Sequence, residues 1–440
     1  MTMTRRSALK GVAAAALLGL SGRIALAEDN GGEILRQWYK VVLMLVRHTA
    51  TYSPPVASRA FAYLGVAAYQ AVASGSTSLV SLEGQLNGLK ALPPRDPSKQ
   101  YSDAVITHCV MASAVKHFFG NTGPTGQRVM AAAEKKLKAE ALKGLAPDVI
   151  AASLAYGEVL QAAIIAWSQD DGGAMIENMG FPMAYEVSKE PGRWVPTSAI
   201  RQQQFPLLPT WGQNRTFAMP SGATCGLPPP PAYSEDPASE FYRQAKEVYD
   251  VTTHLTPEQT LIARFWSDDP MLSPTPPGHW LFIANDLLAQ EKAGLDRTAE
   301  VMMRLGVAMA DGFIGCWNAK YQYDLVRPVT YIRKVIDPKW EPLLITPPFP
   351  EYPSGHSTES GAAAAVMTSL FGENFTFTDR THVRDGLGER TFPSFTAAAD
   401  EAGISRLYGG IHFRAAIDNG LAQGRCIGEY ANALRTRSAA

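Results

Sequence analysis

The sequence predicts a mainly α-helical protein built of two helical bundles, which are joined by a long irregular connection rich in proline and glycine. Two observations support this fold class. Apolar residues recur at spacings of three and four along most of the chain, in segments with many alanines and few β-branched residues. One long region has no sustained period and carries proline-rich runs instead. The hydrophobic content of 46% in 440 residues is ordinary for a globular protein with a large core.

Residues 1–27 have the features of an export signal. An Arg5-Arg6 pair precedes a mildly apolar stretch, and a small-residue motif ends at Ala27, a pattern typical of a twin-arginine signal that is cleaved there. A membrane anchor is the alternative, but the apolar run is far shorter than the ~20 residues that span a bilayer. We therefore expect a periplasmic or secreted protein. We expect that no later stretch is long and apolar enough to span a membrane, and we therefore expect no stable membrane insertion.

The rest of the chain divides into three parts. Residues 28–171 predict an N-terminal helical bundle, residues 172–236 the irregular connection, and residues 237–440 a C-terminal bundle. Helical spacing is clearest over residues 58–73, 126–141, 147–168, 237–251 and 290–319.

Charge and cysteine usage exclude several functions. Forty Lys and Arg residues against 41 Asp and Glu residues leave a formal net charge of -1, so no overall basic field attracts nucleic acid. The four cysteines have no CxxC spacing, which argues against a zinc site, thioredoxin-like chemistry and a disulfide framework; they are Cys109, Cys225, Cys316 and Cys426. We expect them to be buried small hydrophobic residues.

Charged residues gather in short blocks of the last third of the chain. In KYQYDLVRP, Lys320 and Arg327 stand seven residues apart, so about two helical turns place both cations on one face before Pro328 ends the helix. In YPSGH, Ser354 and Gly355 lead into an Ala-rich helix, whose free N–H groups and positive dipole end favour an anion.

A third block, SRLYGGIH, places Arg406 and His412 on either side of a Gly-Gly pair suited to a helix end and a sharp turn. His356 closes the YPSGH block. Arginine forks bind oxyanions bidentately and lysine acts as a point charge. The three blocks together predict a pocket for a tetrahedral or trigonal-bipyramidal oxyanion.

In this order, the three blocks resemble the signature shared by vanadium-dependent haloperoxidases and the acid and lipid phosphatases of the same superfamily. Other segments, among them SPPVASRAFAYLGVAAYQA, GRWVPT, PLLPTWG and FWSDDPMLSPTPPGHW, are similar to exported bacterial vanadium haloperoxidases. The resemblance covers nearly the whole mature chain. The length of that chain and its N-terminal bundle favour the haloperoxidase branch over the small acid phosphatases.

The resemblance implies a cofactor, vanadate, with one per chain. His412 would bind vanadium through Nε2, and His356 would be the acid/base that deprotonates hydrogen peroxide. Lys320 would also polarise the bound peroxide. The vanadate oxygens would be held by Lys320, Arg327, Ser354, Gly355 and Arg406.

Two partners of the histidines stay open. Either Asp268 or Asp269 resembles the carboxylate that orients the acid/base histidine in fungal members. The superfamily usually has Asp four residues after the metal-binding histidine, but Ala416 stands there. The Nδ1 partner of His412 is therefore expected to be another group, such as a backbone carbonyl.

The remaining expectations concern substrates. Trp317 and Phe349 are candidates for the halide site, because fungal chloride oxidisers carry aromatics at these two places. We expect hydrogen peroxide, halide and a small organic acceptor as partners, no nucleic acid, and a possible homo-oligomer. The alternative function is an acid phosphatase with His412 as the phosphoryl-accepting nucleophile and His356 as general acid. A non-catalytic anion-binding protein is the third reading.

The other histidines have no ligand-like spacing. His382 is among those expected to be structural or on the surface. His279, in PPGHW, is expected to be structural or to line a pocket wall.

Overall fold

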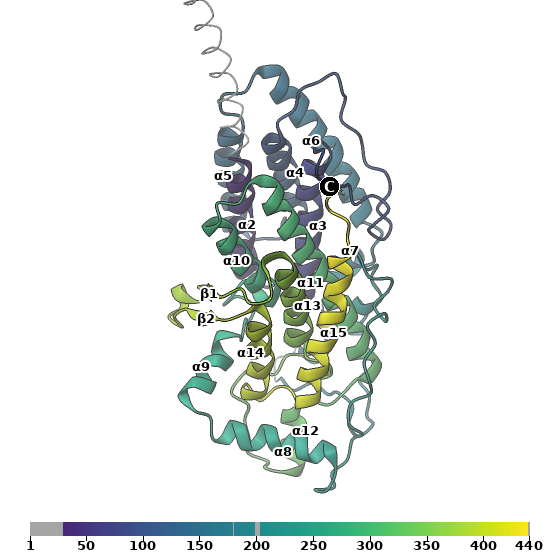
Figure 1. The fold of residues 1–440 in the computed structure, drawn as a ribbon. Coiled ribbons are helices and arrows are strands. Elements are labelled where there is room, and N and C mark those ends of the chain that lie inside the picture. Colours follow the sequence, from purple (N-terminus) through teal and green to yellow (C-terminus); the bar gives the residue numbers. More distant parts are fainter. Residues whose placement is uncertain (1–29, 179, 199–202, 439–440) are drawn as a thin grey trace, which may run out of the picture.

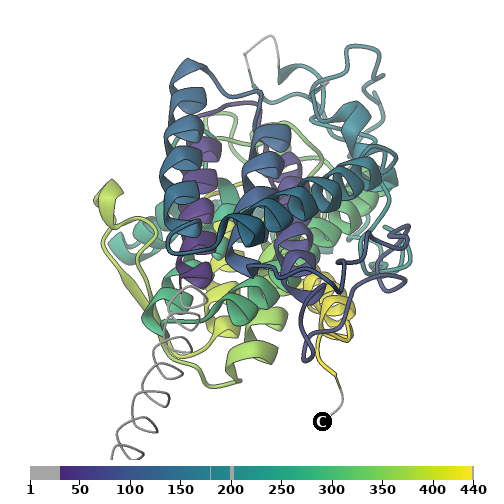
Figure 2. The same cartoon turned by 90° about the horizontal axis from the view of Figure 1, so that it is seen from above.

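The computed structural model describes residues 30–178, 180–198 and 203–438, and it confirms the mainly helical class. The predicted export signal lies outside the described residues. The molecule is elongated, with α4, α5 and α6 at one end and α8 and α12 at the other (Figure 1). Figure 2 gives the view along this direction, with the N-terminal helices nearest the viewer.

The first half contains the helices α2 (Gly31–Arg47), α3 (Pro54–Ala73), α4 (Asp103–Phe118), α5 (Pro124–Ala141), α6 (Pro147–Ser168) and α7 (Gly173–Ile176). The second half contains η2 (Trp211–Gln213), α8 (Glu240–Thr253), α9 (Pro257–Phe265), α10 (Thr275–Gln290), α11 (Leu295–Tyr323), α12 (Pro328–Val335), α13 (Gly355–Phe371), η3 (Val383–Asp385), α14 (Phe395–Tyr408) and α15 (Arg414–Asn432). The antiparallel hairpin of β1 (Phe377–Asp379) and β2 (Arg390–Phe392) pairs Phe377 with Phe392 and projects from the side of the molecule (Figure 1).

Helix starts follow local sequence signals. Proline stands in the first turn of α3, α5, α6, α9, α10 and α12, where its missing N–H costs nothing. The hydroxyl group of the N-cap residue accepts a backbone N–H in α4, α8, α9, α13 and α14. Together with the alanine-rich periodicity, these signals mark where the helices begin.

The helix α11 lies at the centre of the fold and packs against α3, α13 and α15. Glycines permit the closest of these approaches. A Cβ atom at Gly424 of α15 would lie 2.0 Å from the carbonyl oxygen of Thr358 in α13, so only glycine fits there. The start of α13 is tied to the start of α15 as well, since the Ser354 N–H donates to the Ala416 carbonyl at 2.9 Å. This packing brings the YPSGH and SRLYGGIH blocks side by side.

The predicted helix around Lys320 is wrong in its boundaries. α10 ends at Gln290, and α11 runs from Leu295 to Tyr323. Asp324 takes a left-handed conformation with φ of 48° and ends α11. Pro328 begins α12 and Arg327 is its N-cap, because proline fits the first turn of a helix. Lys320 and Arg327 therefore lie on different elements and not on one helical face.

The expectation that the four cysteines are buried small hydrophobic residues without disulfides is also wrong, since Cys109 is half-buried and Cys426 is exposed. Cys225 and Cys426 form a disulfide, whereas Cys109 and Cys316 are free. The two bonded residues are 201 positions apart, so no local spacing signals the bond. Packing of α15 against the segment that contains Cys225 brings them together.

One further expectation fails in α6. Its 22 residues are long and apolar enough to cross a membrane, with a mean hydropathy of 1.7 in the most apolar window, of which 33% is buried. Core helices of soluble proteins meet the same criterion.

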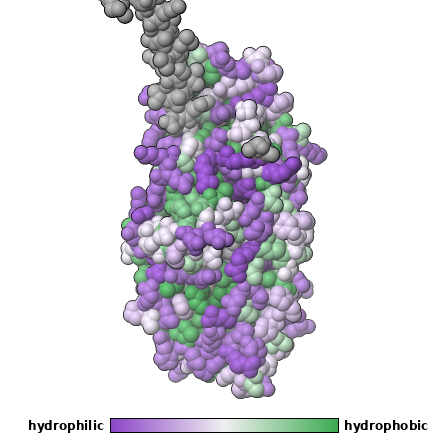
Figure 3. Space-filling model, viewed as in Figure 1, coloured by the Kyte–Doolittle hydropathy of each residue, from purple (hydrophilic) through white to green (hydrophobic). Residues whose placement is uncertain are grey.

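The face of the molecule seen in Figure 3 is largely hydrophilic with hydrophobic patches.

The irregular stretch between the bundles has little regular structure where it is described. Between α7 and α8, the described residues form one short 3-10 helix, η2. The division into bundles at residues 171 and 237 stays a prediction, because α11 packs against helices from both parts of the chain.

Candidate active site

The structure brings together, from five separate elements, the residues that the sequence predicted to bind an oxyanion. α11 supplies Lys320 near its end, and Arg327 precedes α12. The other residues come from the N-terminus of α13, the last turn of α14 and the turn before α15; they are Ser354, Gly355, His356, Arg406 and His412.

His412 lies between a carboxylate and an arginine. Its Nδ1 donates to Glu351 Oε1 at 2.9 Å, and the Phe413 N–H donates to the same oxygen at 2.8 Å. Arg327 Nη1 lies 3.2 Å from Nε2, which must then be the acceptor. Burial, reinforced by the charges of Arg327 and Lys320, lowers the pKa of His412 well below its usual range. The imidazole is therefore neutral, with its lone pair on Nε2.

The partner of His412 Nδ1 is thus a carboxylate, and the expected backbone carbonyl is wrong. Glu351 stands in the segment PFPEYPSGH, five residues before His356, and its side chain is fully buried. Burial raises the pKa of Glu351 to about 7, although Arg327 opposes the shift. Sequence reasoning missed this residue. Its signal was a single acidic residue in an otherwise apolar and proline-rich stretch directly before the predicted site.

Three cations are buried around His412. Lys320, Arg327 and Arg406 are 0%, 0% and 2% exposed. Within the described part of the chain, no carboxylate lies at ion-pair distance from any of them. Burial lowers the pKa of Lys320 to about 7 and those of both arginines to about 10. Charges held in this way are costly unless a counter-ion joins them.

The cations bond to backbone carbonyls in place of carboxylates. Lys320 Nζ donates to the carbonyls of Pro350 at 2.9 Å and Glu351 at 3.1 Å, and also to that of Pro353. Arg327 donates to the Phe349 and Ile411 carbonyls, each at 2.9 Å. The segment from 349 to 353 is therefore fixed by the same cations that face the pocket.

Around His412, three buried side-chain nitrogen atoms have no hydrogen-bond partner among the described residues. They are Arg327 Nη2, Arg406 Nε and His356 Nε2. An unsatisfied buried polar group costs about 1–3 kcal/mol, and more when it is charged. Open N–H groups on two guanidinium groups, next to an imidazole nitrogen that can accept a proton, fit an anion with several oxygens, such as vanadate or phosphate.

The N-terminus of α13 also faces the group formed by His412 and the three cations. Ser354 is the N-cap and its hydroxyl accepts the Ser357 N–H. A Cβ atom at Gly355 would meet only the rings of Trp317 and Phe313, at 3.7 and 4.0 Å, which are ordinary contacts. Packing within the protein does not require glycine there. Close approach of a ligand to the helix N-terminus explains it better.

Neither candidate aspartate bonds to His356 among the described contacts. His356 has a backbone hydrogen bond with Ser267, and burial together with the charge of Arg406 lowers its pKa well below the usual range. Both oxygens of Asp268 bond to other histidines, His279 and His382. Asp269 contributes its charge next to Arg406. Direct orientation of His356 by an aspartate stays a prediction.

Trp317 and Phe349 lie next to each other at the pocket, with ring centroids 4.9 Å apart. Trp317 is held by a bond from Nε1 to the Leu207 carbonyl at 3.2 Å. Lys320 Nζ lies 5.1 Å from the centroid of Phe349, and Arg327 Cζ lies 5.0 Å from it. The aromatic pair therefore forms one apolar wall beside the cations, while a role in halide binding stays a prediction.

The fold and the site define a class of protein, namely a helical enzyme whose buried cations surround a neutral histidine and fit an oxyanion cofactor. The family profile described as the VCPO second helical-bundle domain matches residues 300–439. A solved bacterial vanadium-dependent iodoperoxidase is 40% identical, with a TM-score of 0.85, over 93% of this chain and 98% of the other. The chain belongs to the vanadium-dependent haloperoxidase family and is an enzyme of the peroxidase class.

More distant structures share the fold. The holo-type structure of a bacterial vanadium-dependent chloroperoxidase is 18% identical with a TM-score of 0.69, over 88% of this chain and 92% of that one. An apo-type structure is also 18% identical, with a TM-score of 0.66 and coverages of 87% and 93%. No match is found among curated proteins.

Proposed function

We propose that this protein uses vanadate and hydrogen peroxide to oxidise halide to hypohalous acid, which then halogenates a small organic acceptor. One observation carries the proposal. Three buried cations without carboxylate partners surround the neutral Nε2 of His412, and the two arginines among them have open donors. An arrangement of this kind favours the binding of an anion, which would offset the cost of the buried charges.

The residues present fit vanadate. His412 would bind it through Nε2, and the oxygens would be held by Lys320, Arg327, Ser354, Gly355 and Arg406. Bound vanadate would supply a Lewis acid that activates hydrogen peroxide for attack by halide. The anion would also raise the pKa of Lys320 again, because it restores a negative charge beside the ammonium group.

The acid/base role falls to His356. Its Nε2 is buried and has no partner, and its depressed pKa leaves it neutral at pH 7. A neutral imidazole accepts a proton from hydrogen peroxide and later returns it to the departing oxygen. Its bond with Ser267 holds the ring while the proton moves.

The relatives named above differ in halide, since one is an iodoperoxidase and the others are chloroperoxidases. The wall formed by Trp317 and Phe349 adds no polar donors near the cations and keeps water out. We therefore propose oxidation of iodide and bromide, with some chloride oxidation at acidic pH. Halogenation of monochlorodimedone with each halide, from about pH 4 to 8, tests this. Phe349→His should lower the chloride-to-bromide ratio, and an unchanged ratio would remove the role of the wall.

A phosphatase remains the second candidate because of one feature, the carboxylate behind His412. A carboxylate on Nδ1 increases the nucleophilicity of Nε2, as in other His-carboxylate pairs. The deciding experiment assays the vanadate-loaded protein for peroxide-dependent halogenation of a phenol dye, and the vanadate-free protein for hydrolysis of a phosphate ester. Halogenation by the loaded protein supports the proposal. Ester hydrolysis without any halogenation would replace it with the phosphatase.

We also propose that the protein acts in the periplasm or outside the cell. The Cys225–Cys426 disulfide supports this location, since disulfides persist in oxidising compartments. Fractionation of cells that express the full chain tests it.

A further inference from the structure

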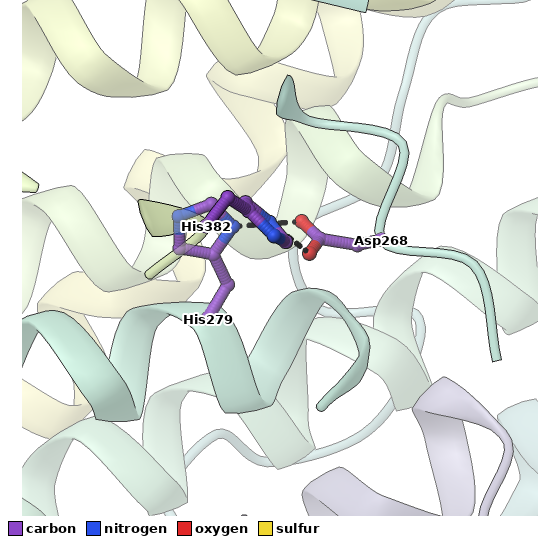
Figure 4. Close-up of side chains that lie close together, drawn as sticks. All are labelled: Asp268, His279 and His382. Carbon is purple, nitrogen blue, oxygen red and sulfur yellow. Dashed lines mark hydrogen bonds and ion pairs between the residues drawn. The ribbon is translucent and has the colours of Figure 1, made fainter. Parts of the chain in front are cut away.

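A second buried charged cluster lies next to the Trp266 and Ser267 backbone, on the side away from Arg406 and His356. Asp268 accepts from His279 Nδ1 at 2.9 Å through one oxygen and from His382 Nε2 at 3.2 Å through the other. Figure 4 shows both imidazole rings beside this carboxylate. None of the three residues is more than 4% exposed.

A second layer of carboxylates surrounds the two histidines. Asp379, in β1, accepts from His279 Nε2 at 2.7 Å, and Asp385, in η3, accepts from His382 Nδ1 at 2.8 Å. Arg47 at the end of α2 pairs with Asp385 near the surface. The Asp268 cluster thus consists of Asp268, His279, His382, Asp379, Asp385 and Arg47.

Charge within the Asp268 cluster is balanced when both histidines are protonated. Burial opposes the charge on His279, but Asp268 and Asp379 outweigh it and raise its pKa to about 10. The pKa of His382 is raised in the same way, against burial, by Asp268. Donor atoms of Asp268, His279 and His382 lie within 4.8 Å of one another, yet each already bonds to a side chain, so the cluster is complete without a metal ion.

The backbone that carries Asp268 is strained. Asp268 has φ of 49°, and Met271 and Thr275 have φ of 70° and 67°, in the left-handed region that non-glycine residues avoid. Such residues persist only where their surroundings hold them. The two bonds to the Asp268 carboxylate provide this restraint at the first strained residue.

The same backbone touches the active site on its other side. The Trp266 carbonyl accepts a bond from Arg406 Nη1, and Ser267 shares a backbone hydrogen bond with His356. These contacts orient a guanidinium group and the acid/base imidazole. Movement of this segment would therefore move two groups of the pocket.

We propose that His279 and His382 are positioning residues, which clamp Asp268 and thereby hold the Trp266 and Ser267 backbone against Arg406 and His356. The inference rests on the proposed function in that vanadate is the probe ligand. It adds to that function a support that draws on α2, α10, β1 and η3, which lie outside the signature blocks.

A pair of substitutions at one position separates the two bonds of His279. An asparagine amide reaches the place of Nδ1, so His279→Asn keeps a donor for Asp268 and loses the one for Asp379. His279→Gln does the reverse. We expect His279→Gln to raise the Kd for vanadate about tenfold and to shift the pH profile of activity, and His279→Asn to raise the Kd much less. Equilibrium dialysis of orthovanadate measures this.

The control is another buried histidine. His108 bonds to Trp38 on the N-terminal helices, so His108→Gln should lower Tm without changing the Kd. His382 provides a second pair with the order reversed, because its Nε2 faces Asp268. At this position, His382→Asn should weaken vanadate binding more than His382→Gln. This second pair tests the proposal independently if a variant at position 279 does not fold.

Equal Kd values for Asn and Gln at both positions, whether unchanged or raised together, would overturn the proposal. A parent protein that binds no vanadate would instead contradict the proposed function. NMR titration of 15N-labelled histidines in the vanadate-free protein distinguishes these failures. The clamp predicts a shifted titration of His356 in His279→Gln and a parent-like one in His279→Asn, and identical titrations would contradict it.

Discussion

Two buried charged clusters lie close together in this protein, and they differ in how their charges are matched. In the Asp268 cluster, three carboxylates face two protonated imidazoles and an arginine, and every charge has a partner. Around His412, three cations face carbonyl oxygens and leave donors open. A matched cluster needs nothing more and supports the fold. We propose that the unmatched cluster is a receptor for an anion, whose binding would balance its charge and stabilise the protein.

The largest effect should follow removal of His412. His412→Ala deletes the Nε2 ligand and removes one of the two donors to Glu351, so both vanadate-dependent halogenation and any phosphate ester hydrolysis should disappear. The three cations around position 412 would remain in this variant, but the ligand on which both activities depend would be gone. Steady-state assays of both activities check this. Full peroxidase activity in the variant would show that the ligand lies elsewhere.

Removing any one of the three cations should weaken the binding of vanadate. Lys320→Ala, Arg327→Ala and Arg406→Ala each delete a charge-assisted bond worth about 1.5–3 kcal/mol, or about tenfold to a hundredfold in the Kd for vanadate. Anion binding should also raise Tm in the parent and less in each variant. Differential scanning calorimetry with and without orthovanadate measures both quantities. Unchanged affinity in all three variants would place the anion site elsewhere.

A smaller effect is expected at Glu351. Glu351→Gln keeps the size of the side chain but replaces the carboxylate on His412 Nδ1, so vanadate affinity should fall by about tenfold, as for other outer ligand partners. Glu300→Gln is a matched control, because Glu300 is also buried and bonds to Thr436 and Arg437. If both substitutions change affinity equally, the carboxylate does not act through His412.

The smallest effect concerns pH and the matched cluster. The pKa of His279 is raised from 6.5 to about 10, so its contribution to the free energy of unfolding is complete below pH 6.5 and is lost as the pH rises toward 10. The stability difference between the parent and His279→Asn should therefore shrink from pH 6 to pH 10. Urea unfolding at several pH values measures it. A difference that is constant with pH would mean that His279 is not charged in the folded protein.

The sequence predicted the unmatched cluster better than the matched one. Lys320, Arg327, Arg406 and His412 stand in short blocks with recognisable turn chemistry, and their meeting follows from the order of the blocks. The residues of the Asp268 cluster come from three separate stretches of the sequence, around residue 47, from 268 to 279 and from 379 to 385, and neither His279 nor His382 has a spacing that marks it. Only packing of α10 against the hairpin region brings them together.

The features that the sequence analysis missed or predicted wrongly are also ones that local sequence patterns mark weakly or not at all. The helix prediction around Lys320 failed because the left-handed Asp324 ends α11, and aspartate gives only a weak signal for that conformation. Glu351 was missed because the partner of His412 comes from another block and not from the expected position four residues later. The Cys225–Cys426 disulfide joins residues 201 apart. Local rules predict elements, whereas partners across the fold depend on tertiary packing.

The most direct test of the unmatched cluster is a crystal structure of the protein soaked with orthovanadate, with vanadium located by its anomalous scattering. The account predicts one vanadium per chain, bonded to His412 Nε2, with its oxygens among Lys320, Arg327 and Arg406. Vanadium bound at the Asp268 cluster, or no vanadium beside His412, would contradict it.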